Sequence, residues 1–189
     1  MKTMLLIGAV AIAGLSTQVP VSVPDSSRGS DLSAPDPKLK AYMPSNPLID
    51  YSGFEKIVLA TEKQRATHRL SEFDFMVATQ ESGVVVLDAR SASMYALRHI
   101  KGAVNLPFTD FTADSLSRVI PAKDSKVLIY CNNNFLGSPI AFASKTATAS
   151  LNLSTYTSLI SYGYTNVYEL GPLLDVKSTV LPFEGTEVK

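Results

Sequence analysis

The stretch Val84-Val85-Val86-Leu87-Asp88 decides the fold, because it is a continuous apolar run that ends in a charged residue. Runs rich in β-branched residues suit strands that are buried on both faces of a parallel sheet. A second such run, Val127-Leu128-Ile129-Tyr130, lies further along the chain and ends at Cys131. The two runs therefore predict two central strands of one sheet.

Helical patterns alternate with these strands. We expect a helix to begin at Ser71, further helices at 91–97, 109–120 and 155–162, and short strands at 103–107 and 166–170. Alternation of this kind predicts an α/β domain with a mainly parallel sheet. In open sheets of this class, sites form beyond the carboxyl ends of the strands, and Asp88, Arg90 and Cys131 lie at such ends.

The first residues have the pattern of a secretory signal peptide. Lys2 is followed by an apolar run, Met4 to Leu15, which contains the small-x-small sequence Ala11-Ile12-Ala13. The run is shorter than the ~20 residues of a spanning helix. We expect a signal peptide at 1–16, with an uncleaved membrane anchor as the alternative.

The expected processing gives a three-part organisation. A stretch rich in Pro, Ser and Asp, 17–48, is expected to be a linker, and 49–189 to be one domain. The mature protein is then periplasmic or secreted, with no membrane insertion after processing.

Composition argues against several classes of partner. Lys and Arg together number 17 and so do Asp and Glu, without a basic run, so nucleic acid is not an expected partner. The two histidines, His68 and His99, are far apart and lack companions at metal-ligand spacing. We expect no metal and no cofactor. His68 lies among basic residues and is expected to be exposed.

Cys131 is the candidate nucleophile. It is the only cysteine, so an exported chain must either hide this thiol or use it. The reactive form of a thiol is the thiolate, which backbone N–H groups and a following helix N-terminus stabilise. The alternative is that Cys131 is a packed apolar residue beside an ordinary turn. The residues alone leave both interpretations open.

The loop after Cys131 holds the candidate substrate contacts. Asparagine tolerates left-handed backbone angles, and its amide donates hydrogen bonds to an anionic donor or an outer sulfur. Phenylalanine and leucine in the loop form a pocket wall or anchor it in the core, and glycine adds backbone freedom. The candidates are Asn132, Asn133, Asn134, Phe135, Leu136 and Gly137.

Four segments in order resemble one family. They are Val85–Ser91, His99–Pro107, Val127–Cys131 and Gly163–Leu170. Together they are similar to the rhodanese-like domain family, which has an LD-x-R strand end, a GHI-x-GA-x-N-x-P segment, an active-site strand and a late GY-x-NV-x-x-L strand. The resemblance implies a three-layer α/β fold with a central, mainly parallel sheet flanked by helices.

The resemblance also implies an activity. Active members transfer sulfane sulfur through a cysteine persulfide, which would form on Cys131. The implied partners are a small sulfur donor and a thiophilic acceptor, either a small molecule or a partner protein thiol. Asp88, Arg90 and His99 are then structural residues near the site. From the residues alone, Asp88 and Arg90 as substrate contacts and His99 as the base of a Cys/His hydrolase are weaker alternatives.

The chain also departs from the family pattern. Arg98 stands where the family has a glycine before His-Ile, and residues 171–175 stand where it has GG-x-x-x-W. The loop 132–138 has no Arg, and the stretch 139–154 is an extra segment relative to the family pattern. These departures motivate an alternative function, a catalytically inactive binding or interaction module in the cell envelope. A cysteine phosphatase is a minor alternative, because such enzymes place Arg six residues after the cysteine, where this chain has Gly137.

Overall fold

Five parallel strands form the central sheet of the computed structural model, which describes residues 46–188. The strand order is β1-β7-β5-β2-β4, and every neighbouring pair is parallel. The bounds are β1 Arg69–Leu70, β7 Val167–Leu170, β5 Val127–Tyr130, β2 Val85–Asp88 and β4 Val104–Asn105. In this register Asp88 lies opposite Tyr130, so the carboxyl ends of β2 and β5 meet.

Strand β5 is buried on both faces, as its sequence predicts. Its residues alternate between two hydrophobic clusters: Leu128 and Tyr130 belong to one, and Val127 and Ile129 to the other. All four residues are at most 1 % exposed. The sheet is therefore the middle layer of the domain, with a core on each side.

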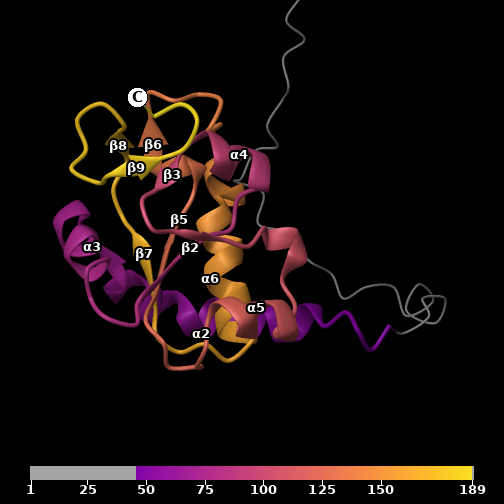
Figure 1. The fold of residues 1–189 in the computed structure, drawn as a ribbon. Coiled ribbons are helices and arrows are strands. Elements are labelled where there is room, and N and C mark those ends of the chain that lie inside the picture. Colours follow the sequence, from indigo (N-terminus) through magenta and orange to yellow (C-terminus); the bar gives the residue numbers. More distant parts are fainter. Residues whose placement is uncertain (1–45, 189) are drawn as a thin grey trace, which may run out of the picture. The chain divides into compact units, whose positions relative to one another are not determined.

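Helices cover both faces of the sheet, as Figure 1 shows. Helix α3 (Glu72–Ala78) lies on one side in that view, and α5 (Ala113–Val119) and α6 (Leu151–Ser161) lie on the other. Helix α4 (Ala92–Leu97) packs against the same hydrophobic cluster as α3. Short 3₁₀ turns lie at Phe108–Asp110 (η1), Asn132–Asn134 (η2) and Ala147–Ala149 (η3). The predicted three-layer α/β fold with a mainly parallel sheet is confirmed.

Two small sheets lie beside the main one. Strand β3 (His99–Ile100) pairs antiparallel with β9 (Phe183–Glu184). Strand β6 (Phe135–Leu136) pairs parallel with β8 (Leu174–Asp175). The second pair ties the chain that follows Cys131 to the chain that follows β7.

The predicted helices differ from the observed ones mainly at their ends. Ser71 caps α3 by accepting a 3.1 Å hydrogen bond from the backbone N–H of Asp74. The segment 109–120 is split into η1 and α5, because Thr112 forms a capping box with Ser115 and starts a new helix. Helix α6 begins at Leu151 rather than at Thr155, and Gly163, with a φ of 85°, follows its end.

Helix α2 (Tyr51–Thr67) was not predicted. Asp50 caps it by accepting a 2.8 Å hydrogen bond from the N–H of Gly53. Its apolar residues are largely exposed and only Thr61 is buried, so the helix has no apolar stripe that faces a core. It packs against α6, and a 2.7 Å ion pair joins Arg65 to Glu169 of β7.

The expectation of an exposed His68 is wrong. His68 is half-buried, and its ring stacks on Tyr168 with a centroid separation of 4.3 Å. Its Nδ1 lies 2.8 Å from the carbonyl oxygen of Val167. The pairing of β1 with β7 brings these residues together, which the local basic sequence does not reveal.

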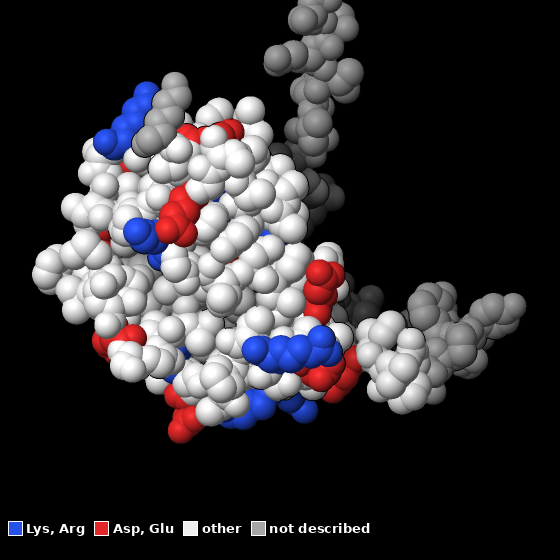
Figure 2. Space-filling model, in the orientation of Figure 1, with Lys and Arg blue, Asp and Glu red and all other residues white. Residues whose placement is uncertain are grey.

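The predicted signal peptide and almost all of the predicted linker lie outside the described residues, and both stay predictions. Within 46–188, no helix has the length and apolar character needed to cross a membrane. On the face of the domain that Figure 2 shows, charged side chains of both signs lie in small groups separated by uncharged surface.

Candidate functional site

Cys131 lies directly after the last residue of β5, at the carboxyl edge of the central sheet. It is 1 % exposed and is an unpaired cysteine. Its backbone N–H donates a 2.9 Å hydrogen bond to Oδ1 of Asn134. Because Cys131 is almost completely buried, a reactant can approach the sulfur only through the small hollow that this residue lines.

The chain after Cys131 forms the tight 3₁₀ turn η2. The N–H of Asn134 donates a 3.1 Å hydrogen bond to the carbonyl oxygen of Cys131, which closes the turn. Among the described residues no residue other than glycine has a positive φ, so the expected left-handed asparagines are absent from this loop. A 3₁₀ turn needs only right-handed backbone angles, which explains the difference.

Asn134 connects the turn to two other segments. Its Oδ1 also accepts a 3.1 Å bond from Nδ2 of Asn152 in α6. Its Nδ2 donates to the carbonyl oxygens of Leu170 and Pro172, at 2.8 and 3.2 Å. Asn134 is 6 % exposed. Both of its amide hydrogens are therefore engaged, and its side chain holds the site in shape.

Asn132 and Asn133 bind the segment that folds over the turn. Nδ2 of Asn132 donates to the carbonyl oxygen of Ala143. Asn133 and the backbone of Lys145 exchange two hydrogen bonds, of 2.8 and 2.9 Å. The extra segment, 139–154, is thereby fixed to the loop, and Lys145 is exposed.

Phe135, Leu136 and Gly137 lie away from the sulfur. Phe135 is buried in the core cluster that contains Tyr130, and Leu136 is exposed in β6. Gly137 has a φ of 85° and packs close to Asp175. None of the three lines the hollow that contains Cys131. They anchor and turn the loop.

The extra segment returns to the cysteine at Ser150. The hydroxyl oxygen of Ser150 lies 3.5 Å from Sγ of Cys131, and α6 begins at the next residue. The sulfur therefore lies beside the N-terminal end of an 11-residue helix, although many residues separate the two in sequence. The N-terminal end of a helix carries a partial positive charge that attracts anions.

A hollow of about 120 Å³ lies beside Cys131. Its walls include Ser150 and Asn152, and also Arg65, Arg69 and Glu169 from outside the loop. Glu169 is 1 % exposed and forms ion pairs of 2.7 Å with Arg65 and 3.0 Å with Arg69. The charged side chains of this hollow comprise two arginines and one carboxylate.

Asp88 and Arg90 form a buried ion pair that supports the same edge of the sheet. Nη2 of Arg90 lies 2.5 Å from Oδ2 of Asp88, and Nη1 donates to the carbonyl oxygen of Ala141 at 2.7 Å. Burial alone lowers the pKa of Arg90, but the hydrogen bond and charge of Asp88 outweigh it and raise the pKa. Arg90 thus holds the start of the extra segment from inside the core.

Tyr130 completes this network. Its hydroxyl donates to Oδ2 of Asp88 at 2.5 Å and accepts from the N–H of Ile100 at 3.1 Å. Burial, and then the charge of Asp88, raises the pKa of Tyr130 well above its ordinary value. The hydroxyl therefore stays protonated over the physiological range and fixes the end of β5, directly before Cys131.

His99 lies away from the sulfur. Its Nδ1 is 2.8 Å from the carbonyl oxygen of Tyr95, and its ring stacks on the Tyr95 ring at 3.7 Å. Nε2 lies 3.7 Å from a carboxylate oxygen of Glu184. It does not line the Cys131 hollow. The arrangement gives His99 no route to act as a base for this thiol.

A larger hollow of about 470 Å³ lies on another side of the loop. Met94, Phe108 and Leu151 line it, with Asn132 and Lys145, but Cys131 does not. Its volume is within the ~300–1,000 Å³ typical of small-molecule pockets. Of these two hollows, only the smaller one has Cys131 among its lining residues.

Sequence reasoning found the cysteine and two neighbours that line the same hollow, Asn133 and Asn134, but it missed the others. Arg65, Arg69, Ser150, Asn152 and Glu169 lie in no motif with Cys131. The one local signal is Glu169 itself, which is the only charged residue of the otherwise uncharged strand β7. A charged side chain in a buried strand indicates a partner of opposite charge. Among residues 46–188 no group of three or more His, Cys, Asp or Glu side chains is arranged to hold a metal ion.

Fold and site together define an α/β domain with a single cysteine at the carboxyl edge of a parallel sheet. The family model for the rhodanese-like domain matches residues 74–171. Because this match covers more than half of the 189 residues, the chain belongs to the rhodanese-like domain family. No curated protein matches the sequence.

Several solved structures are similar to the chain at low identity. A rhodanese with anions from E. coli is 23 % identical, with 54 % of this chain and 98 % of that one covered and a TM-score of 0.37. The BH2092 protein from Bacillus halodurans is 18 % identical, with 70 % and 88 % covered and a TM-score of 0.46. A thiosulfate sulfurtransferase from Pseudomonas aeruginosa is 22 % identical, with 55 % and 17 % covered and a TM-score of 0.39.

Proposed function

We propose that this protein transfers sulfane sulfur and carries it as a persulfide on Cys131. The observation that carries the proposal is the environment of Cys131: the residue lines a small polar hollow, and its Sγ lies 3.5 Å from the Ser150 hydroxyl, beside the start of α6. A hydroxyl donor and a helix N-terminus both stabilise an anion on sulfur. A cysteine that only fills space in the core needs neither.

The reaction has two steps. The Cys131 thiolate attacks the outer sulfur of a donor such as thiosulfate, the S–S bond of the donor breaks, and sulfite leaves with the bonding electron pair. An acceptor thiolate then attacks the outer sulfur of the Cys131 persulfide and regenerates the thiolate. No second cysteine and no cofactor takes part, in keeping with a one-cysteine chain.

The experiment is to weigh the intact protein before and after incubation with thiosulfate. We expect a gain of one sulfur atom per chain, removed again by cyanide or a small thiol, and no gain in the Cys131→Ser variant. The Ser150→Ala variant should gain sulfur more slowly, whereas Ser154→Ala, at an exposed position in the first turn of α6, should not differ from the native protein.

The opposite result favours the interaction module instead. A chain that takes up sulfur from neither thiosulfate nor an organic persulfide, although it folds and its thiol can be alkylated, has no sulfurtransferase activity. Cys131-dependent hydrolysis of an aryl phosphate would instead support the phosphatase alternative.

A further inference from the structure

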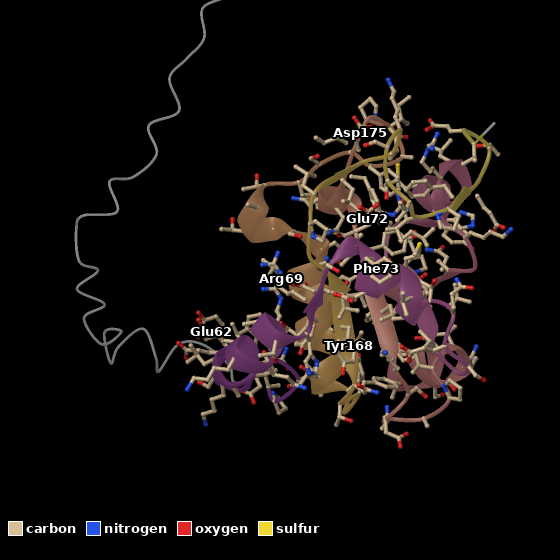
Figure 3. The ribbon with its side chains drawn as sticks, turned by 90° about the vertical axis from the view of Figure 1, so that its left-hand side faces the viewer. Glu62, Arg69, Glu72, Phe73, Tyr168 and Asp175 are labelled. Atoms are coloured by element: carbon tan, nitrogen blue, oxygen red, sulfur yellow. The ribbon has the colours of Figure 1, made fainter. Side chains whose placement is uncertain are left out.

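The positive charges that line the Cys131 hollow come from elements outside the loop 132–138. Arg65 comes from the last turn of α2 and Arg69 from β1, and both line the hollow together with Cys131. In Figure 3, Arg69 projects from the strand into the space between α2 and the segment that leads into α6. The loop itself contains no arginine.

One carboxylate is shared between these two arginines. Arg65 donates to both carboxylate oxygens of Glu169, at 2.7 and 2.9 Å. Arg69 pairs with Oε1 of Glu169 at 3.0 Å and donates to the carbonyl oxygen of Gly171 at 2.9 Å. Because Glu169 can neutralise only one guanidinium, the lining side chains other than Cys131 carry one net positive charge.

The guanidinium donors are not all used. Nε of Arg65 is buried and has no hydrogen-bond partner among the described residues. The Arg69 side chain is 52 % exposed, so it can shift toward a ligand without leaving the protein surface. Buried donors without partners are rare in folded proteins and often mark a position where a water or a ligand binds.

We propose that Arg65 and Arg69 recognise the anionic group of the molecule that reacts with Cys131, and that they supply from α2 and β1 the charge that the loop lacks. The identity of the reaction at Cys131 rests on the proposed function. The recognition of an anion by the two arginines does not depend on it. The hollow of about 120 Å³ suits a small oxyanion and is well below the ~300–1,000 Å³ of pockets for larger ligands.

Two alkylating reagents of nearly equal size test this recognition. Iodoacetate is an anion and iodoacetamide is neutral, and each forms a thioether with the Cys131 thiolate and releases iodide. The ratio of the two rates cancels changes in thiol ionisation and access. We expect a higher iodoacetate-to-iodoacetamide ratio in the native protein than in free cysteine, and a decrease of this ratio as salt is added.

Four variants give the direction of the effect. Arg69→Gln and Arg65→Gln should each lower the ratio roughly three- to tenfold, the effect of one partly screened charge. Arg65→Lys keeps the charge and should retain most of the ratio. Glu169→Gln removes the shared carboxylate and should raise the ratio.

Arg118→Gln is the matched control, because Arg118 lies exposed on α5 and pairs with Asp114. It should leave the ratio unchanged. Thermal unfolding identifies any variant that fails to fold, and Arg69→Gln, at a half-exposed position, then carries the test alone. Equal ratios in the native protein and in folded Arg69→Gln would overturn the proposal.

The thiosulfate assay separates this inference from the proposed function. If thiosulfate transfers sulfur, Arg69→Gln should raise its KM more than it lowers kcat. If thiosulfate transfers none and the alkylation ratio still depends on the arginines, the proposed function fails and the recognition of an anion stands. If thiosulfate transfers sulfur but the alkylation ratio does not change in the arginine variants, the proposed function stands and the recognition of the anion by Arg65 and Arg69 fails.

Discussion

Asn134 shows how one residue fixes the position of the candidate nucleophile. It accepts from the N–H of Cys131 and from Asn152, and it donates to the carbonyl oxygens of Leu170 and Pro172. Three of the segments that line the Cys131 hollow are thereby joined through one buried amide. An aspartate has the same shape but cannot donate, so only an amide satisfies both sets of partners.

Tyr156 makes the stability of the fold sensitive to alkaline pH. Its side chain is fully buried, and its hydroxyl has no hydrogen-bond partner among the described residues. Burial, and then the negative charge of Glu169, raises the pKa of Tyr156 to about 12. In the unfolded chain the value is ~10. The unfolded state therefore releases this proton first as the pH rises.

We predict that this group leaves stability unchanged below about pH 10 and lowers it progressively from there toward pH 12. Tyr156→Phe should show a smaller loss of stability over this range and at least native stability at neutral pH, because it removes a buried hydroxyl that has no hydrogen-bond partner among the described residues. Urea unfolding at several pH values measures the free energy of unfolding of the native protein and of the variant. The exposed control Tyr51→Phe should keep the native decline, and an equally steep decline in Tyr156→Phe contradicts the assignment.

At the scale of elements, the strands were predictable and some helices were not. Strand β5 follows from its own sequence, because four consecutive apolar residues can be buried only between two layers. Helix α2 shows no such pattern, because it attaches to the domain through polar contacts such as Gln64 with the carbonyl oxygen of Thr165. A hydrophobic pattern cannot reveal an element that is held by hydrogen bonds and ion pairs.

The loop after Cys131 is held at its far end by the β6–β8 pair. Gly137 follows β6 with a φ of 85°, and a Cβ there would lie 2.8 Å from Oδ1 of Asp175 and 3.0 Å from Cγ2 of Val176. Asp175 has little freedom to move, since Oδ1 accepts a 2.9 Å hydrogen bond from the N–H of Lys177. Both the backbone angle and the space therefore require glycine.

We predict that Gly137→Ala lowers the free energy of unfolding by about 2 kcal/mol, from the left-handed backbone angle and the crowding together. Gly102→Ala is the matched control, because Gly102 has a φ of 80° but nothing lies within 4 Å of the added Cβ. It should cost about 1 kcal/mol, the conformational part alone. Urea unfolding compares the two, and an equal loss would show that contact with Asp175 is unimportant.

At the scale of the whole molecule, the site is assembled by the order of the strands. Strand β1 joins the sheet beside β7 and places Arg69 directly opposite Glu169. The position of Cys131 could be predicted from its own strand, but the charges around it depend on this pairing between segments far apart in sequence. No motif around Cys131 carries that information, so sequence reasoning found no cation for the site.

Helix α2 should therefore stabilise the domain through the charge on Glu169. We predict that a chain beginning at His68 folds but is less stable by ~1–3 kcal/mol than a chain beginning at Asn46, because a buried carboxylate loses one of its two cationic partners, itself 30 % exposed. The chain that begins at Asn46 is the control, because it lacks residues 1–45 but retains α2. Urea unfolding measures both.

Glu169→Gln then distinguishes the charge from the packing of α2. In the chain beginning at Asn46 the substitution should be destabilising, since it leaves Arg65 and Arg69 facing each other without a carboxylate. In the chain beginning at His68 only Arg69 remains, so the same substitution should cost at least ~1 kcal/mol less. An equal cost in the two chains would mean that α2 stabilises the domain only through its other contacts, with α6 and with Thr165, and that Arg65 does not share in neutralising the carboxylate beside Cys131.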